Sequence, residues 1–271
     1  MASGIAFRLH HSGFRVAMTE IAAPTAVRRA VCFSEAVYEG HSQVEDVCAL
    51  LVKDEAGMKG AFANKQIAVF VDPAAAIVKK LKPAVLVDAI MAKTNTGTAL
   101  TDAPLVIGVG PGFAAGIDCH AVIETRRGHT LGRVITEGNA LPNTGVPGEV
   151  GGYTVERILR SPADGVFSAL FSIGDEVKKG DVVALARSAM DASESGTGSA
   201  LGHPLMAEID GILRGLLPSG ITVSRGMKAG DIDPRCERAH CFTVSDKALA
   251  VGGGVLEACL RFSVGKTSCF F

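Results

Sequence analysis

The chain has no tryptophan and only two tyrosines among its 271 residues, so it is poor in the aromatic side chains on which nucleic-acid bases stack. It also lacks a charge excess, since 27 basic and 28 acidic residues leave a formal net charge of −1. A general nucleic-acid-binding surface needs an excess of basic residues, and we therefore expect no nucleic-acid partner. No run of about 18 apolar residues occurs, so we expect no membrane-spanning helix and no membrane partner.

Cysteine pairs with the spacing of a zinc site are also missing. The seven cysteines are scattered and odd in number, and Cys236 and Cys241 have no second pair to complete a metal site. Reduced thiols are the usual state of such cysteines in the cytosol. We therefore expect a cytoplasmic protein.

The strongest pattern in the sequence is an internal repeat, because 164–181 and 210–227 are one segment written twice with a constant offset of 46. Each copy places strand-length apolar runs between glycines, which predicts two similar β units. The second copy runs into Asp231, Asp233 and Arg235, which form either a structural ion-pair corner or an acidic site. Six of the eighteen paired positions are identical, namely Asp164/Asp210, Gly165/Gly211, Leu170/Leu216, Gly174/Gly220, Val177/Val223 and Gly180/Gly226.

Two such β units joined by a central turn resemble the biotinyl/lipoyl domain, a flattened barrel of two similar halves. In carrier domains of that family, a lysine in the central turn receives the cofactor. This chain has no lysine between Lys179 and Lys228, so we expect no biotin or lipoate. The module is then expected to act as a scaffold or docking surface, with 193–202 as a mobile loop between the copies and 263–271 as a loose tail.

The N-terminal part has the pattern of an α/β protein. Residues 2–11 have helical spacing, Gly13 is placed to end that helix, and an alternating strand follows and ends at Glu20. Helix, glycine, strand and acidic residue form the second half of a dinucleotide-binding unit, so Glu20 is a candidate cofactor-binding residue. The first strand and glycine loop of such a unit would precede the helix, and we expect the chain to begin inside the motif.

Further apolar runs at 67–71, 84–87 and 105–109 predict buried strands of a parallel sheet. The glycines at 252–254 are expected to form a turn that opens a final helix. The predicted fold class is α/β, Rossmann-like with its first strand missing, followed by a β-rich barrel-sandwich-like module and a C-terminal helix. The corresponding domains are 1–104, 105–245 and 246–271.

Several residues beyond the predicted strand ends could bind an anion or a cofactor. Lys93 and Asn95 combine a cation with an amide. Gly110 and Gly112 belong to a glycine loop that could cradle a phosphate, although an ordinary tight turn has the same composition. Lys247 lies at the start of the final helix, where backbone N–H groups could face an anion.

One segment carries a denser set of reactive side chains. If 118–124 is a strand, Asp118, His120 and Glu124 share one face because side chains alternate with a period of two. These three could bind a metal, or His120 and Glu124 could act as an acid–base pair, with Arg126 and His129 just beyond as cofactor-binding candidates. The plain alternative is a half-exposed strand with a polar outer face.

Taken together, seven sequence blocks distributed along the chain resemble the selenium-dependent molybdenum hydroxylase accessory, or maturation, proteins. The resemblance implies a factor that binds a nucleotide, a molybdopterin-type cofactor or a selenium donor and docks onto a purine- or xanthine-type molybdenum hydroxylase. Members of that family begin with a strand and a Gly-Gly-Gly-Asp loop, which this chain lacks. The blocks are 2–6, 87–95, 108–120, 124–129, 207–217, 230–235 and 245–257.

Two other functions stay open from the residues. The chain could be a stand-alone nucleotide- or NAD(P)-using enzyme with His120 and Glu124 as its acid–base residues. It could also be a pure scaffold, because the β module lacks an attachment lysine. The cofactor itself is unknown from the sequence, with a molybdopterin-type group or a nucleotide as the expected classes.

Overall fold

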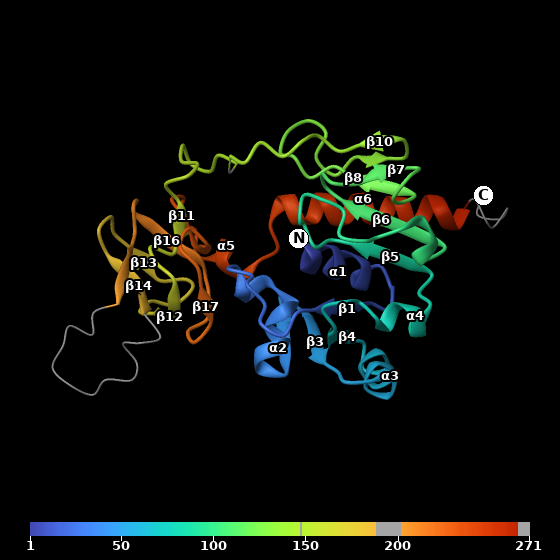
Figure 1. Ribbon diagram of the computed structural model, residues 1–271, viewed down its shortest axis with the longest axis horizontal. Helices are drawn as coiled ribbons and strands as arrows, with labels where there is room; N and C mark the ends of the chain where they lie inside the picture. Colours follow the sequence, from blue (N-terminus) through green and yellow to red (C-terminus); the bar gives the residue numbers. More distant parts are fainter. Residues whose placement is uncertain (147, 188–201, 265–271) are drawn as a thin grey trace. The chain divides into compact units, whose positions relative to one another are not determined.

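A computed structural model describes residues 1–146, 148–187 and 202–264 (Figure 1). The chain divides into two compact units: the first comprises Met1–Ala22, Asp46–Gly145 and Val244–Phe271, and the second Ala23–Glu45 and Val146–Thr243. Most of the expected loop at 193–202 and of the expected tail at 263–271 lies outside the described residues. Within the described part, no helix is both long and apolar enough to cross a membrane.

The first unit contains a small parallel sheet centred on β4 (Ile67–Val71), with β1 (Ala17–Glu20) on one side and β3 (Val47–Leu51) on the other. Helix α3 (Glu55–Ala63) packs against β4, because Ala61 shares a core with two β4 side chains. Asp54 caps this helix by accepting a hydrogen bond of 2.8 Å from a backbone nitrogen of its first turn.

A second sheet of the same unit has the order β5-β6-β8-β9. Strands β5 (Val85–Asp88), β6 (Leu105–Val109) and β8 (Ala121–Ile123) are parallel, and β9 (Val134–Ile135) closes the sheet antiparallel to β8. Every residue of β6 and β8 is buried, which explains why these strands are apolar throughout rather than alternating.

Helices α1 (Ala2–His11) and α6 (Asp246–Val264) cover one face of this second sheet, and Figure 1 shows α6 running along it. The two helices approach closely, because a Cβ atom on Gly4 would lie 2.6 Å from the Cβ of Ala248 and one on Gly252 would lie 2.9 Å from the carbonyl oxygen of Gly4. The predicted opening of the final helix at 252–254 is therefore wrong. The helix begins at Asp246, and Gly252 and Gly254 serve close packing rather than a turn.

The other face of the second sheet is covered by irregular chain, in which Phe113 and Cys119 belong to a buried cluster with Val106 and Val122. Four short elements complete the described part of the first unit: α4 (Ile77–Leu81), the 3-10 helix η3 (Leu100–Asp102), and the paired strands β7 (Ala114–Ala115) and β10 (Gly138–Asn139).

The second unit begins with short elements and continues into eight strands. The short elements are η1 (Arg29–Val31), η2 (Phe33–Glu35), α2 (Ala36–Glu39), β2 (His41–Val44) and, near the end of the unit, α5 (Ala239–Phe242). The eight strands are β11 (Ile158–Arg160), β12 (Gly165–Ala169), β13 (Glu176–Val177), β14 (Val182–Arg187), β15 (His203–Met206), β16 (Gly211–Leu216), β17 (Thr222–Val223) and β18 (Lys228–Asp233).

These eight strands form two antiparallel sheets, and each sheet contains strands from both copies of the repeat. One sheet has the order β11-β18-β16-β13 and the other β15-β14-β12-β17. Replacing each strand by its counterpart in the other copy converts one order into the other, so the two sheets are related by a pseudo-twofold axis. A single core lies between them, with Phe167, Val177, Leu213 and Val223 among its buried side chains.

The predicted fold class requires correction. The apolar strands of the N-terminal half do not build one Rossmann-type sheet, because β4 is already paired on both edges, by β1 and by β3, and β5 pairs with β6 instead. The chain is a mixed α/β protein with several small sheets. The expected Rossmann-like domain followed by a barrel-sandwich-like module is therefore wrong.

Candidate functional site

The three parallel strands β5, β6 and β8 end at the same edge of their sheet. Asp88 ends β5 opposite Gly108, while Val109 ends β6 opposite Ile123, the last residue of β8. The loops that follow these strands therefore leave the sheet together. In open α/β sheets, ligands bind at this carboxyl edge.

Two glycines bring the three loops into contact. A Cβ atom on Gly112 would lie 2.8 Å from the carbonyl carbon of Lys93, and one on Gly110 would lie 2.8 Å from the Oγ1 atom of Thr125. Both glycines have positive φ, +113° and +82°, which L side chains rarely adopt. Gly110 and Gly112 thus allow close backbone approach, and their predicted role in cradling an anion stays a prediction.

Hydrogen bonds within the loop after β5 hold its shape. The amide oxygen of Asn95 accepts from the backbone nitrogens of Gly97 (2.9 Å) and Thr98 (2.8 Å), and its amide nitrogen donates to the Thr98 carbonyl (2.8 Å). The buried carboxylate of Asp88 accepts from the Thr98 hydroxyl at 2.6 Å. Asn95 therefore positions the loop, while a direct role in anion binding stays a prediction.

Lys93 projects from a backbone conformation that side chains seldom adopt. Its φ is +71°, and that of Met91 is +65°. Non-glycine residues in this region cost of order 1–3 kcal/mol each and occur where the surrounding structure holds them, often at functional sites. The Asn95 and Asp88 hydrogen bonds are the local structure that holds this loop.

Cationic side chains from three different segments converge at this edge. Partial burial lowers the pKa of Lys247, and the charges of Arg127 and Lys93 lower it further against the opposing effects of Glu124 and Asp246. Arg127 is paired with Asp246, with one N···O distance of 2.9 Å. Among the described residues, neither Lys93 nor Lys247 forms an ion pair. Three cations thus share an edge with two carboxylates, and both carboxylates already accept hydrogen bonds.

Glu124 is one of those carboxylates, and it holds the loops beside β8. It is 2% exposed, and its two oxygens accept from the backbone nitrogens of Arg126 (2.7 Å) and Leu141 (2.8 Å). Backbone donors of this kind satisfy a buried carboxylate. Its geometry in this structure is that of a structural anchor.

The structure does not bring Asp118, His120 and Glu124 onto one strand face. β8 comprises only Ala121–Ile123, so His120 and Glu124 lie at its opposite ends, roughly 13 Å apart at about 3.3 Å per residue. The Nδ1 atom of His120 accepts from the backbone nitrogen of Val106 (3.0 Å), and Asp118 accepts from that of Ala114 (2.8 Å). The expected strand over 118–124 is therefore wrong, and the shared face that depended on it has no basis in this structure. Among the described residues, no group of three His, Cys, Asp or Glu side chains could hold a metal ion.

The other predicted positions are dispersed. Glu20 ends β1 in the first sheet, where its side chain accepts a hydrogen bond of 2.8 Å from the backbone nitrogen of Ile21. Arg126 and His129 are exposed on the loop after β8. Cofactor binding by Glu20, Arg126 and His129 stays a prediction.

Sequence reasoning missed Arg127, which completes the cationic edge. Its partner Asp246 lies 119 residues away in the chain, and no local periodicity reports a contact over that distance. The adjacent arginines 126 and 127 were the signal available, but the sequence pattern does not tell which of them turns toward α6.

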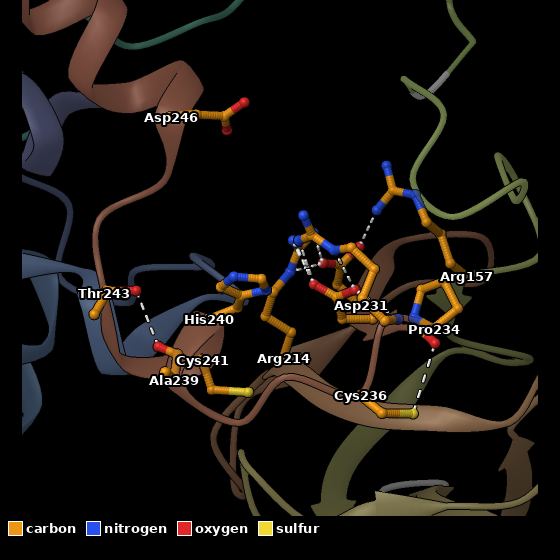
Figure 2. Close-up of polar contacts among 12 residues, drawn as sticks. Arg157, Arg214, Asp231, Pro234, Cys236, Ala239, His240, Cys241, Thr243 and Asp246 are labelled. Atoms are coloured by element: carbon orange, nitrogen blue, oxygen red, sulfur yellow. Dashed lines mark hydrogen bonds and ion pairs between the residues drawn. The ribbon is translucent and has the colours of Figure 1, made fainter.

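A second polar cluster lies in the second unit around the end of β18. Asp231 and Asp233 are 1% and 0% exposed, and Figure 2 shows Arg157 and Arg214 approaching Asp231 from different sides. Arg214 donates to Asp231 (2.8 Å) and to Asp233 (3.0 Å), and Arg235 donates to Asp233 (2.9 Å). Of the two alternatives for this segment, the structural ion-pair corner is therefore confirmed.

Comparison with known proteins identifies one long match. The chain is 48% identical over 258 residues to the uncharacterized protein YqeB of Escherichia coli strain K12. The match takes 95% of this chain but 45% of that protein, so the chain spans about half the length of the curated relative that it matches. No protein-family model matches the chain.

Similar solved structures overlap only partly. An aspartoacylase family protein from Mesorhizobium loti is 25% identical, with a TM-score of 0.24 over 29% of this chain and 23% of its own. A succinylglutamate desuccinylase from Silicibacter sp. TM1040 is 14% identical, with a TM-score of 0.25 over 80% of this chain and 57% of its own. The ectoine utilization protein EutE (DoeB) from Ruegeria pomeroyi is 18% identical, with a TM-score of 0.24 over 36% of this chain and 27% of its own. These overlays are too poor to transfer a fold or a reaction to this chain.

The sequence comparisons nevertheless correct the expected identity. No protein-family model matches the chain, and the name of the curated relative states no link to a molybdenum hydroxylase. The expected membership in the hydroxylase accessory family, with its selenium and molybdopterin chemistry and its hydroxylase partner, is therefore overturned. The alternative of an NAD(P)-using enzyme built on His120 and Glu124 receives no support either, and those two side chains hold separate backbone groups.

Proposed function

We propose that the first unit binds a small molecule carrying a phosphate group, such as a nucleotide, at the carboxyl edge of β5, β6 and β8. The observation that carries the proposal is the convergence of Lys93, Arg127 and Lys247, two of which form no ion pair within the described residues. Lys247 is partly buried whereas Lys93 and Arg127 are exposed, and the positive charges of those two residues repel that of Lys247. A bound anion would relieve that repulsion.

The residues at this edge would contribute to anion binding in different ways. Lys93 and Lys247 would supply the counter-charges, since an ammonium group acts on phosphate as a point charge. The glycine loop at 110–112 would let backbone approach the ligand. Asn95, Asp88 and Glu124 would act indirectly, by holding the loops from which the cations project.

Isothermal titration calorimetry of the full chain with inorganic phosphate, pyrophosphate and ATP tests the proposal. We expect saturable heats that disappear, or weaken at least about tenfold, in Lys247→Met, because a hydrogen bond to a charged group contributes about 1.5–3 kcal/mol. Lys79→Met is the matched control, since Lys79 belongs to α4, away from these strand ends. Equal phosphate affinities for the wild type and Lys247→Met would contradict the proposal.

We also propose a cytoplasmic location for this activity. Six described cysteines are free thiols, and three of them, Cys119, Cys241 and Cys259, are buried. Reduced thiols persist in reducing compartments. Alkylation of the native protein purified with and without reductant, followed by mass spectrometry, would reveal any disulfide that contradicts this location.

A further inference from the structure

The buried charge cluster of the second unit carries more positive than negative charge. Arg157, Arg214 and Arg235 already pair with the two carboxylates, Asp231 and Asp233. A fourth cation, Arg28, acts electrostatically on the same cluster: partial burial lowers its pKa, Arg214 lowers it further, and the aspartates oppose the shift. Charges removed from water need a counter-ion or a full set of hydrogen bonds.

Arg28 lacks such a counter-ion. Its guanidinium donates to the carbonyl oxygens of His240 (2.7 Å) and Thr243 (3.4 Å), and among the described residues it forms no ion pair. Carbonyl oxygens orient the guanidinium but carry no formal charge, and Asp231 and Asp233 act on it without a direct ion pair. Arg28 is thus a fixed guanidinium without a directly bonded carboxylate among the described residues.

Two buried nitrogen atoms on this side of the cluster have no hydrogen-bond partner among the described residues. They are the Nε atom of Arg28 and the Nδ1 atom of His240. Arg28 donates to the backbone carbonyl oxygen of His240, so the two unpaired nitrogens belong to residues that contact each other. Leaving a buried polar group unpaired costs about 1–3 kcal/mol.

Close contacts with β16 hold Arg28 in this position. A Cβ atom on Gly215 would lie 3.2 Å from the Cγ atom of Arg28, so a glycine is what lets the Arg28 stem lie against the strand. Both neighbours of Arg28 are bonded to Leu216: the Val27 carbonyl accepts from the Leu216 backbone nitrogen (2.8 Å), and the side-chain Nε of Arg29 donates to the Leu216 carbonyl (3.1 Å). The guanidinium is therefore supported by a rigid strand.

From this geometry we propose that the second unit contains an oxyanion-binding site formed by Arg28 and His240, with Arg214 adding positive charge. The ligand class is a small molecule with a phosphate or carboxylate group. A guanidinium presents N–H donors in a planar fork that matches both groups. His240 would donate from Nδ1 in the appropriate tautomer or as the imidazolium. This site is distinct from the one proposed at the strand ends of the first unit.

Nuclear magnetic resonance of the full chain tests this site without any mutation. We expect the Nε–H resonance of Arg28 to shift and saturate when inorganic phosphate or acetate is added at constant ionic strength. A shift with phosphate alone assigns the site to phosphate ligands, and a shift with acetate alone assigns it to carboxylates. An Arg28 resonance that moves with neither anion overturns the proposal.

Variants then separate this site from the one at the strand ends. Arg28→Lys keeps the charge but loses the planar fork, so we expect about tenfold weaker anion binding in calorimetry at the second-unit site. Arg225→Met, an exposed arginine of the same unit, should leave the binding unchanged. Lys247→Met should leave the Arg28 shift intact, so the two proposals can fail independently. Unchanged anion binding in Arg28→Lys would contradict the second site.

Discussion

The carboxylate of Asp164 accepts a hydrogen bond of 2.7 Å from the backbone nitrogen of Arg225. Its counterpart in the other copy of the repeat, Asp210, accepts one of 2.8 Å from the backbone nitrogen of Lys179. Each copy therefore fastens a turn of the other copy. This reciprocity explains why an aspartate is kept at the same place in both.

Asp164→Ala and Asp210→Ala should consequently lower the free energy of unfolding by similar amounts. Each substitution leaves one turn nitrogen without its carboxylate acceptor. Urea unfolding of the two single variants and the double variant measures this. Because the sites are related but separate, we expect the two effects to add. A large difference between the single variants would show that the two halves are not energetically equivalent.

The buried cluster should be far more sensitive than the turns. Replacing Asp231 by Ala leaves Arg157 and Arg214 buried without their shared carboxylate, and breaking such a pair typically costs about 3–5 kcal/mol. Urea unfolding monitored by circular dichroism should detect this loss. Asp181→Ala is the control, because the Asp181 carboxylate accepts from the backbone nitrogen of Lys178 in an exposed turn (2.8 Å). An equal effect there would contradict the importance of the cluster.

Acid should weaken the same cluster within a defined pH range. Burial opposes ionisation of Asp233, but hydrogen bonds from Arg235 and the charges of Arg214 and Arg235 outweigh it and lower the pKa to about 2 from 3.8. Since the folded-state pKa lies below the unfolded value, the stabilisation is present above about pH 4 and is lost as the pH falls toward 2. The free energy of unfolding, measured between pH 2 and 5, should fall more steeply in the wild type than in Asp233→Asn.

Anion binding at the strand ends should be coupled to protonation of Lys247. Its pKa is lowered by burial and by Arg127 and Lys93, so the protonated side chain destabilises the folded state. The free energy of unfolding therefore increases as the pH rises from the lowered pKa toward 10.5. A bound phosphate would raise the pKa of Lys247, so anion binding would be accompanied by proton uptake. Calorimetry at about pH 8.5 in two buffers of different ionisation enthalpy measures this uptake. An equal uptake in Lys247→Met would contradict the assignment.

Two adjacent glycines of α6 should respond oppositely to alanine. A Cβ atom on Gly252 would lie 2.9 Å from the Gly4 carbonyl oxygen, whereas one on Gly253 would meet nothing within 4 Å. Gly252→Ala should therefore destabilise the protein by about 1–3 kcal/mol through overpacking. Gly253→Ala should stabilise it by about 1 kcal/mol through helix propensity. Thermal unfolding of the two variants measures these changes in stability. Equal effects of the two substitutions would contradict the close packing of α1 and α6.

Local sequence patterns were sufficient to locate individual elements. Apolar runs located β4 and β6 at their observed bounds, Gly13 ended α1, and the offset of 46 assigned each strand of 164–181 a counterpart in 210–227. These features depend on neighbours within a few residues, where backbone preference and side-chain period act directly.

The pairing of strands and the contacts between charged side chains depend on the tertiary structure. β4 takes β1 and β3 as neighbours rather than β5, and Arg157 finds Asp231 at a separation of 74 residues. Gly252 has the sequence context of a turn residue, but α1 packs against it inside α6. Such contacts depend on shape and burial across the whole chain, and local patterns carry no record of either. The cations of both proposed sites come from distant segments, which is why the sequence revealed them singly and the fold brought them together.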